Sequence, residues 1–392
     1  REKLPDFYAT VSDIKQKGYD ADYISDRYLQ TAATEHGMIQ TPGGTEYKAL
    51  IIPSVKRMPL QTLEKIVALA KGGAKIIFTG QYPSDVPGFS RLAERRDSLA
   101  NLLAQLPEAN NFDNCRAEPE PFKTRFGGEY IRRTHREGYH YFFTMLQNKE
   151  VNGWMPLTVK AVSAMLFDPM TGKSGKAHIR EAGNQTEIYL QLKPGESMIV
   201  KTFSRKQTDA PEWVYYKESG KGFALTDHWQ MNFIESDPAI KGDFSLPALG
   251  SWTDLPDDSL AVNKGTARYR TSFLLAEKKK GSEYRLCLGD VRESARVYVN
   301  GERVATLFSV PFHTNIGAYL KEGENHIEIE VTNLPANRIA DYDRRGVRWR
   351  KFHDINFVNI AYDDTRFDTW APLPSGLLGP VTVKELVINP IP

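Results

Sequence analysis

The chain has 392 residues, of which 41% are apolar and 26% are charged, as in ordinary globular proteins. Because a single hydrophobic core seldom grows beyond about 300 residues, this length predicts two or three domains. The formal net charge of +2 argues against a nucleic-acid partner, and no apolar run approaches the ~20 residues that a membrane span needs. The two cysteines, Cys115 and Cys287, lie in different predicted domains and give neither a disulfide framework nor a zinc site.

Residues 1–115 alternate between helix and strand patterns. The helices are expected over 5–17, 60–71 and 90–106, and the strands over 19–25, 47–53 and 74–80. The nearly uniform apolar run at 74–80 is typical of a parallel strand covered on both faces. We therefore expect a flavodoxin-like α/β layer domain over 1–115. Because such a fold opens with a strand and this chain opens with a helix pattern, we expect the first strand to be missing.

This layout resembles the amidotransferase-like domain that follows the catalytic barrel in several glycosidases. A working amidotransferase needs a nucleophile on a sharp elbow between a strand and a helix. The ends of the expected strands hold no cysteine, and Ser54 lacks the flanking glycines of a serine elbow, so we interpret it as a helix cap or turn residue. No catalysis is expected from this domain.

Residues 122–205 change to a period of two, after a polar stretch at 107–121 that contains three prolines. The expected strands cover 138–146, 159–162, 165–172, 176–180, 186–192 and 197–203. Short strands at this spacing, separated by turns such as Pro194-Gly195, predict a small β-sandwich. Trp154 either stacks on sugar or is a half-buried core or interface aromatic, and we favour the second interpretation.

A polar linker over 204–222 precedes the third predicted domain, residues 222–392. Asn300-Gly301 joins two alternating runs, and both residues tolerate the positive φ angles of a type I′ hairpin turn. Alternation over 266–273 and 326–331 predicts strands with one buried face. The residues expected on that face are Ala267, Tyr269, Thr271, Ile327, Ile329 and Val331. Period two held over several short segments predicts an antiparallel β-sandwich.

Several motifs in this domain carry a family resemblance. The strings T-A-R-Y-R at 266–270, V-Y-V-N-G at 297–301 and I-E-I-E-V-T-N at 327–333 resemble the sugar-binding jelly-roll domain of family 2 glycoside hydrolases. The stretches 333–343, 345–349 and 374–380 resemble the C-terminal region of glycoside hydrolase family 106, the α-L-rhamnosidases. The similarity extends over the whole chain.

The resemblance implies a galactose-binding-type jelly roll at 222–392, within the C-terminal, non-barrel part of a glycoside hydrolase that acts on rhamnose-containing, plant-type glycans. In that family the acid and base carboxylates lie on a catalytic barrel, and this chain shows no barrel pattern, so no catalytic residue is assigned. The implied partners are carbohydrate and the N-terminal barrel of the parent chain, with no cofactor. The implied location is the periplasm or the cell exterior.

The insertion at 333–370 holds the densest group of polar and aromatic residues. Planar Asn, Asp and Arg groups suit sugar hydroxyls, and an aromatic face suits the apolar side of the ring. The candidate carbohydrate-binding residues are Asn337, Arg338, Asp341, Arg345, Trp349, Asp354, Asn356 and Trp370. In this hypothesis Trp349 stacks on the ring, Asp341 accepts from hydroxyls, and Arg345 donates to ring or linkage oxygens.

Two alternatives remain for the insertion: its charges pin a long loop over a tryptophan core, or they contact the barrel. Asp290, Glu293, Asp363 and Asp364 offer oxygens for calcium, but their spacing fits no calcium loop, so no metal site is assigned. For the whole chain, the alternatives to a glycosidase part are a stand-alone carbohydrate-binding protein and an oligomerisation module.

Overall fold

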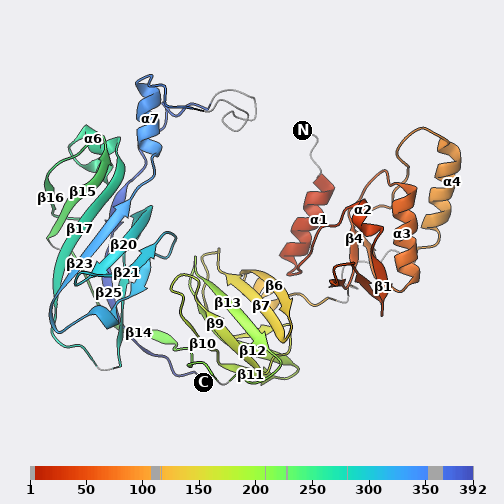
Figure 1. Cartoon of the computed structure of the whole chain (residues 1–392), viewed down its shortest axis with the longest axis horizontal. Helices are drawn as coiled ribbons and strands as arrows, with labels where there is room; N and C mark the ends of the chain where they lie inside the picture. Colours follow the sequence, from red (N-terminus) through yellow and green to blue (C-terminus); the bar gives the residue numbers. More distant parts are fainter. Residues whose placement is uncertain are drawn as a thin grey trace.

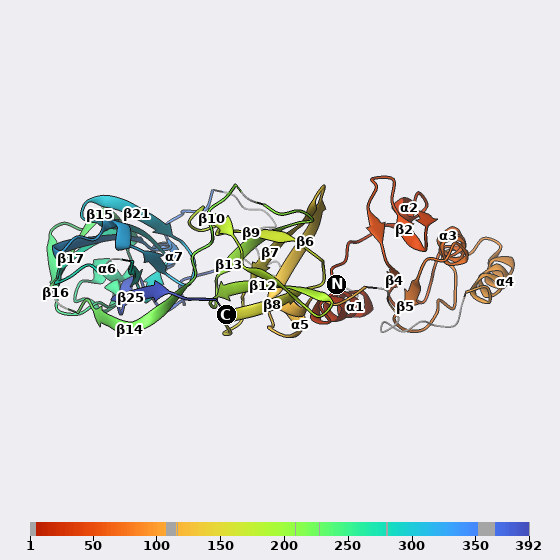
Figure 2. The ribbon, with the colours of Figure 1, turned by 90° about the horizontal axis from the view of Figure 1, so that it is seen from below.

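The computed structural model describes residues 5–106, 115, 117–207, 209–226, 228–279, 281–351 and 365–391. These residues form three parts that follow one another in space, an α/β part, a small β-sandwich and a larger β-sandwich (Figures 1 and 2). Each part is built around its own cluster of buried apolar side chains. None of the helices within the described ranges is long and apolar enough to cross a membrane.

The α/β part contains one parallel strand pair, in which β4 (Leu50–Ile52) lies beside β5 (Ile76–Phe78). The connecting helix α3 (Leu60–Lys71) has the expected bounds and buries its apolar stripe in the core of this part. The other elements are α1 (Pro5–Gln16), α2 (Asp26–Leu29), α4 (Leu92–Leu103) and a small antiparallel sheet of β1 (Ala33–Glu35), β2 (Met38–Gln40) and β3 (Glu46–Tyr47).

Two expectations for the α/β part are not confirmed by the structure. The strand expected over 19–25 is wrong, because these residues run as an exposed segment without strand pairing between α1 and α2. A flavodoxin-like layer is not confirmed, because the described residues of this part supply one parallel strand pair and one isolated parallel bridge, beside an antiparallel three-stranded sheet.

The small sandwich packs a five-stranded sheet, ordered β10-β9-β13-β7-β6, on a three-stranded sheet, ordered β11-β12-β8. Its elements are α5 (Pro121–Thr124), β6 (Glu129–His135), β7 (Gly138–Thr144), β8 (Val151–Leu157), β9 (Ser163–Phe167), β10 (Ser174–Lys176), β11 (Ile179–Ala182), β12 (Gln185–Leu192) and β13 (Ser197–Phe203). No strand forms over 159–162, so this expectation is wrong. The strand in this region is β8, which lies at the edge of its sheet, where a proline such as Pro156 is tolerated. Trp154 is half-buried, edge-on to Tyr189 with Arg180 over its ring.

The larger sandwich packs a six-stranded sheet, ordered β16-β15-β17-β23-β20-β21, on a four-stranded sheet, ordered β14-β25-β18-β22. Its strands are β14 (Tyr216–Ala224), β15 (Trp229–Asp237), β16 (Asp243–Leu246), β17 (Lys264–Leu275), β18 (Glu283–Cys287), β19 (Asp290–Arg292), β20 (Ser294–Val299), β21 (Glu302–Leu307), β22 (His313–Asn315), β23 (Gly323–Thr332), β24 (Gly376–Gly379) and β25 (Thr382–Ile388). The short helices are α6 (Asp258–Ala261) and α7 (Ala336–Arg344).

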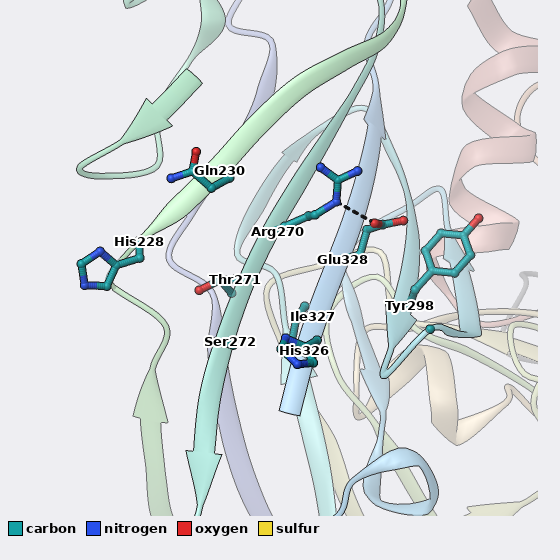
Figure 3. Close-up of a pocket in the computed structure, with 10 residues that line it drawn as sticks. His228, Gln230, Arg270, Thr271, Ser272, Tyr298, His326, Ile327 and Glu328 are labelled. Atoms are coloured by element: carbon teal, nitrogen blue, oxygen red, sulfur yellow. Dashed lines mark hydrogen bonds and ion pairs between the residues drawn. The ribbon is translucent and has the colours of Figure 1, made fainter. Parts of the chain in front are cut away.

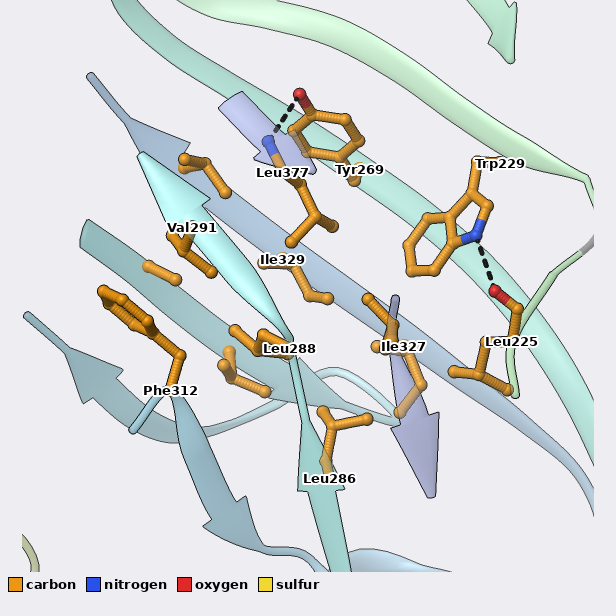
Figure 4. Close-up of a cluster of buried hydrophobic side chains, with 14 of the residues drawn as sticks. Leu225, Trp229, Tyr269, Leu286, Leu288, Val291, Phe312, Ile327, Ile329 and Leu377 are labelled. Carbon is orange, nitrogen blue, oxygen red and sulfur yellow. Dashed lines mark hydrogen bonds between the residues drawn. The ribbon is translucent and has the colours of Figure 1, made fainter. Parts of the chain in front are cut away.

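The predicted alternation in the larger sandwich is confirmed. The expected inward residues of β17 and β23 are buried, and Figure 4 shows Tyr269, Ile327 and Ile329 in the core between the sheets. The turn between β20 and β21 has positive φ at both Asn300 (52°) and Gly301 (85°), as a type I′ hairpin requires. Because β14 begins at Tyr216 and pairs with β25, the last residues of the expected linker are strand.

Contacts at two places tie the parts together. The carbonyl of Gly18, after α1, accepts hydrogen bonds from the Glu120 N–H (2.8 Å) and the Tyr130 hydroxyl (2.9 Å). Between the sandwiches, His313 Nε2 lies 3.0 Å from a carboxylate oxygen of Glu196. The chain end returns to the small sandwich, where the Asn389 N–H donates to the Tyr215 carbonyl.

Candidate carbohydrate-binding site

The insertion between β23 and β24 begins with helix α7, where the sequence analysis expected a loop. Figure 1 shows α7 projecting from one end of the larger sandwich. Of the predicted binding residues, Asn337, Arg338 and Asp341 lie on α7, and Arg345 follows it. Asp354 and Asn356 lie outside the described residues.

Asn337 anchors the returning chain to α7. Its amide Nδ2 donates to the Leu373 carbonyl, and its Oδ1 accepts from the Leu373 N–H, both at 2.8 Å. The side chain is buried and also lies 3.4 Å from the Ser375 hydroxyl. Its hydrogen-bonding groups are therefore used within the protein.

Arg338 ties α7 to the sheet below it. Its guanidinium donates to Asp341 and to Asp237 at the end of β15, both at 2.8 Å, and lies over the ring of Tyr342. The Arg338 hydrogen bond, together with one from the Tyr342 hydroxyl, holds the pKa of Asp237 below its ordinary value despite some burial. Arg345 donates to the same Asp341 oxygen at 3.2 Å, so this carboxylate already accepts from two arginines.

Asp343 positions an aromatic group beside α7. One of its oxygens accepts from Trp349 Nε1 at 2.7 Å, and the other accepts from the Phe367 N–H at 2.9 Å. Burial alone would raise the pKa of Asp343, but these hydrogen bonds and the nearby guanidinium of Arg350 lower it. The carboxylate thus joins the two sides of the insertion.

The aromatic residues border an apolar groove of about 460 Å³. Phe367 stands edge-on to Trp370, with ring centroids 4.9 Å apart, and Trp370 is 47% exposed. The described residues that line the groove include no carboxylate; they are Leu334, Pro335, Ala336, Ile339, Trp349, Arg350, Thr365, Phe367 and Trp370. Its described lining therefore offers the apolar and aromatic contacts that the non-polar side of a sugar ring requires, without an acid–base pair of carboxylates.

The six candidate residues that the structure describes lie in one region, but they differ in whether they line the groove. Trp349 and Trp370 line the groove, whereas Asn337, Arg338, Asp341 and Arg345 are bonded within the protein. Sequence reasoning missed Asp237, because nothing in the chain marks a residue about a hundred positions before Arg338 as its partner. It also left Phe367 out of the candidate set, although Phe-x-x-Trp at 367–370 carries aromatics at a turn.

The oxygen ligands considered for calcium do not form a site among the described residues. No group of three or more His, Cys, Asp or Glu side chains in the described ranges is arranged to hold a metal ion. Asp290 instead accepts from Arg292 at 2.7 Å, and Asp363 and Asp364 lie outside the described part.

Comparisons with known proteins find matches to glycoside hydrolase families in two stretches of the chain. Residues 2–114 match the profile of the α-L-rhamnosidase family, glycoside hydrolase family 106. Residues 253–370, which include α7 and the aromatic groove, match the galactose-binding domain-like profile of glycosyl hydrolase family 2. The second match confirms the expected galactose-binding-like β domain.

Two proteins illustrate the similarity. A rhamnosidase from Novosphingobium sp. PP1Y, a solved structure, shares the fold over 94% of this chain, with a TM-score of 0.68 and 24% identity. A curated relative from Formosa agariphila, named a putative β-glucuronidase, is 32% identical over 181 residues, 42% of this chain. This chain spans 36% of the solved rhamnosidase, and the match spans 16% of the curated relative. The resemblance to the family 106 α-L-rhamnosidases, with a family 2-like galactose-binding domain, is thereby confirmed.

Proposed function

We propose that this chain is the C-terminal, non-barrel portion of an α-L-rhamnosidase-like glycoside hydrolase that acts on rhamnose-containing, plant-type glycans. It serves as scaffold and supplies contacts to the substrate, while the barrel of the parent chain supplies the acid and base. The parent enzyme works in the periplasm or outside the cell.

One observation carries this proposal: the family 106 match at 2–114 and the galactose-binding-like match at 253–370 occur in one chain. The fold shared with the solved rhamnosidase over 94% of this chain takes in both stretches and the small sandwich between them. The coverage of the solved rhamnosidase supports the view that the parent is much longer than this chain.

The aromatic groove gives the scaffold a direct role in binding. L-Rhamnose is a 6-deoxy sugar, so one end of its ring carries a methyl group where most hexoses carry a hydroxymethyl group. Trp349, Phe367 and Trp370 present the apolar, aromatic wall that such a methyl group and the ring face need.

The test is a panel of aryl glycosides given to the full-length product of the gene. Hydrolysis of the α-L-rhamnoside, with little turnover of the β-glucuronide or β-galactoside, is the expected result. Turnover of the β-glucuronide instead would favour the activity named for the Formosa relative, which the 32% identity makes the second candidate.

The binding-module and oligomerisation alternatives are separated by titration calorimetry of this polypeptide. Heat released with rhamnose-containing oligosaccharides is expected from the proposed role and from a stand-alone binding protein. If the full-length product also hydrolyses nothing, the binding-module interpretation stands. A concentration-dependent dimer without any sugar binding would point to the oligomerisation module.

A further inference from the structure

A second hollow lies on the outward face of the six-stranded sheet, away from the insertion. Its volume is about 550 Å³, within the range of small-molecule sites. Figure 3 shows Arg270 and Glu328 meeting between neighbouring strands, with Gln230 to one side and Tyr298 to the other. We call this hollow the sheet-face groove, and its floor is formed by Gln230, Arg270, Ser272, Tyr298, His326 and Glu328.

Strand register explains why these side chains lie in a row. Gln230 of β15 is paired with Arg270 of β17, Arg270 with Glu328 of β23, and Glu328 with Tyr298 of β20. Directly opposed residues point to the same side of a sheet, so an amide, a guanidinium, a carboxylate and a phenol follow one another across four strands. At about 4.8 Å between strands, the row is about 14 Å long, which suits a short oligosaccharide better than one sugar ring.

The charges in the groove compensate each other. The row itself holds one guanidinium and one carboxylate, and Arg270 Nε donates to Glu328 at 3.0 Å. Arg268, which contacts the other Glu328 oxygen at 3.2 Å, is itself paired with Glu330 at 2.6 Å. The row therefore has no surplus of positive charge for a phosphate or polyanion. Arg270 also donates to Asn232, and these two bonds leave further N–H donors of its guanidinium for a ligand.

The same side chains argue against a protein partner. Protein interfaces are anchored by large apolar or aromatic side chains in their centres. Here Ile327 and Thr271 are buried toward the core, and the side chains presented outward are an amide, a hydroxyl, a phenol, imidazoles and one ion pair. We propose that the sheet-face groove binds a neutral oligosaccharide through its hydroxyl groups, separately from the aromatic groove.

Saturation-transfer NMR on the whole polypeptide tests this, with short neutral oligosaccharides of rhamnose, galactose, arabinose and xylose as probes. Arg270→Gln is expected to weaken binding of the responding probe about tenfold, because it removes charged hydrogen-bond donors. Glu328 keeps its contact with Arg268 in this variant, so the sheet is expected to stay folded.

Arg180→Gln is a matched control. Like Arg270, Arg180 forms an ion pair with a glutamate on the neighbouring strand, here Glu187 at 2.8 Å. The two arginine side chains are also similarly exposed, 47% for Arg180 and 45% for Arg270. It should leave probe binding unchanged. Should Arg270→Gln fail to fold, Gln230→Ala replaces it, because within the described ranges the exposed Gln230 side chain bonds only to Ser245.

The proposal is overturned if no neutral probe shows saturation transfer from the protein. It is also overturned if Arg270→Gln binds the responding probe with an affinity within about twofold of that of the unchanged protein. Tighter binding of a uronic-acid oligosaccharide than of every neutral probe would refute the neutral ligand. The proposed function is tested separately, by the hydrolysis panel on the full-length product. The sheet-face groove and the proposed function can therefore be refuted independently of each other.

Discussion

Asn337 and Leu373 are joined by a reciprocal pair of hydrogen bonds, in which the side-chain amide of one satisfies both backbone groups of the other. The two residues lie at opposite ends of the insertion, so this contact closes the segment that carries the aromatic groove. A buried amide bonded in this way acts as a clasp.

Asn337→Ala is therefore expected to lower the free energy of unfolding by about 1–3 kcal/mol, because buried polar groups lose their partners. Urea unfolding followed by tryptophan fluorescence measures the change. The exposed Asn101→Ala on α4 serves as control and should stay within about 0.5 kcal/mol. Equal effects from both changes would show that the clasp contributes nothing.

Asp237 gives a prediction about pH. Its pKa in the folded protein lies below the ordinary value of 3.8, chiefly because Arg338 donates to it. A depressed carboxyl pKa adds stability that is present above pH 3.8 and is lost as the pH falls through the folded-state pKa. Asp237→Asn should thus destabilise clearly at about pH 7 and less at about pH 2.5. A destabilisation that is the same at both pH values would refute the assignment, and the exposed Asp243→Asn is the control.

Gly195 lies where the two sandwiches meet. It has φ of +85°, and a Cβ there would sit 2.3 Å from the Val310 carbonyl oxygen of the larger sandwich. Gly183→Ala is a matched control, since its φ is +63° with no atom within 4 Å of an added Cβ. Both alanines should cost about 1–2 kcal/mol for the left-handed backbone. Gly195→Ala should cost at least about 1 kcal/mol more and loosen the joint, as limited proteolysis between the sandwiches would report.

Trp370 tests the aromatic groove. Trp370→Ala should weaken binding of an aryl α-L-rhamnoside to this polypeptide about fivefold, because a stacked ring contact contributes about 1 kcal/mol. Titration calorimetry measures the change, and Phe308→Ala, which removes another exposed aromatic residue, should leave the affinity unaltered. An unchanged affinity in Trp370→Ala would remove this tryptophan from the site.

The sequence predicted best where local pattern and burial agree. Asn300-Gly301 and the alternation around Ile329 specify a hairpin and a buried face without reference to distant residues. The Pro194-Gly195 turn was equally visible, but its contact with Val310 was not, because that contact depends on how two sandwiches meet.

The parts that were missed depend on tertiary partners. Helix α7 has the sequence A-N-R-I-A-D-Y-D-R, whose Asn and Asp residues favour turns and caps over helix interiors. It is held by bonds to Leu373 and Asp237, which no local rule reveals. The same reason explains why the sequence did not show that Arg338 and Asp341 are hydrogen-bonded to each other, to Asp237 and to Arg345.

The most direct measurement of the central proposal is the release of aryl alcohol from an α-L-rhamnoside by this polypeptide alone. If the bond-breaking carboxylates belong to a separate barrel, the rate equals that of buffer, while the full-length product hydrolyses the same compound. Turnover by this polypeptide that disappears when one of its own Asp or Glu residues is changed to the amide would contradict the proposal.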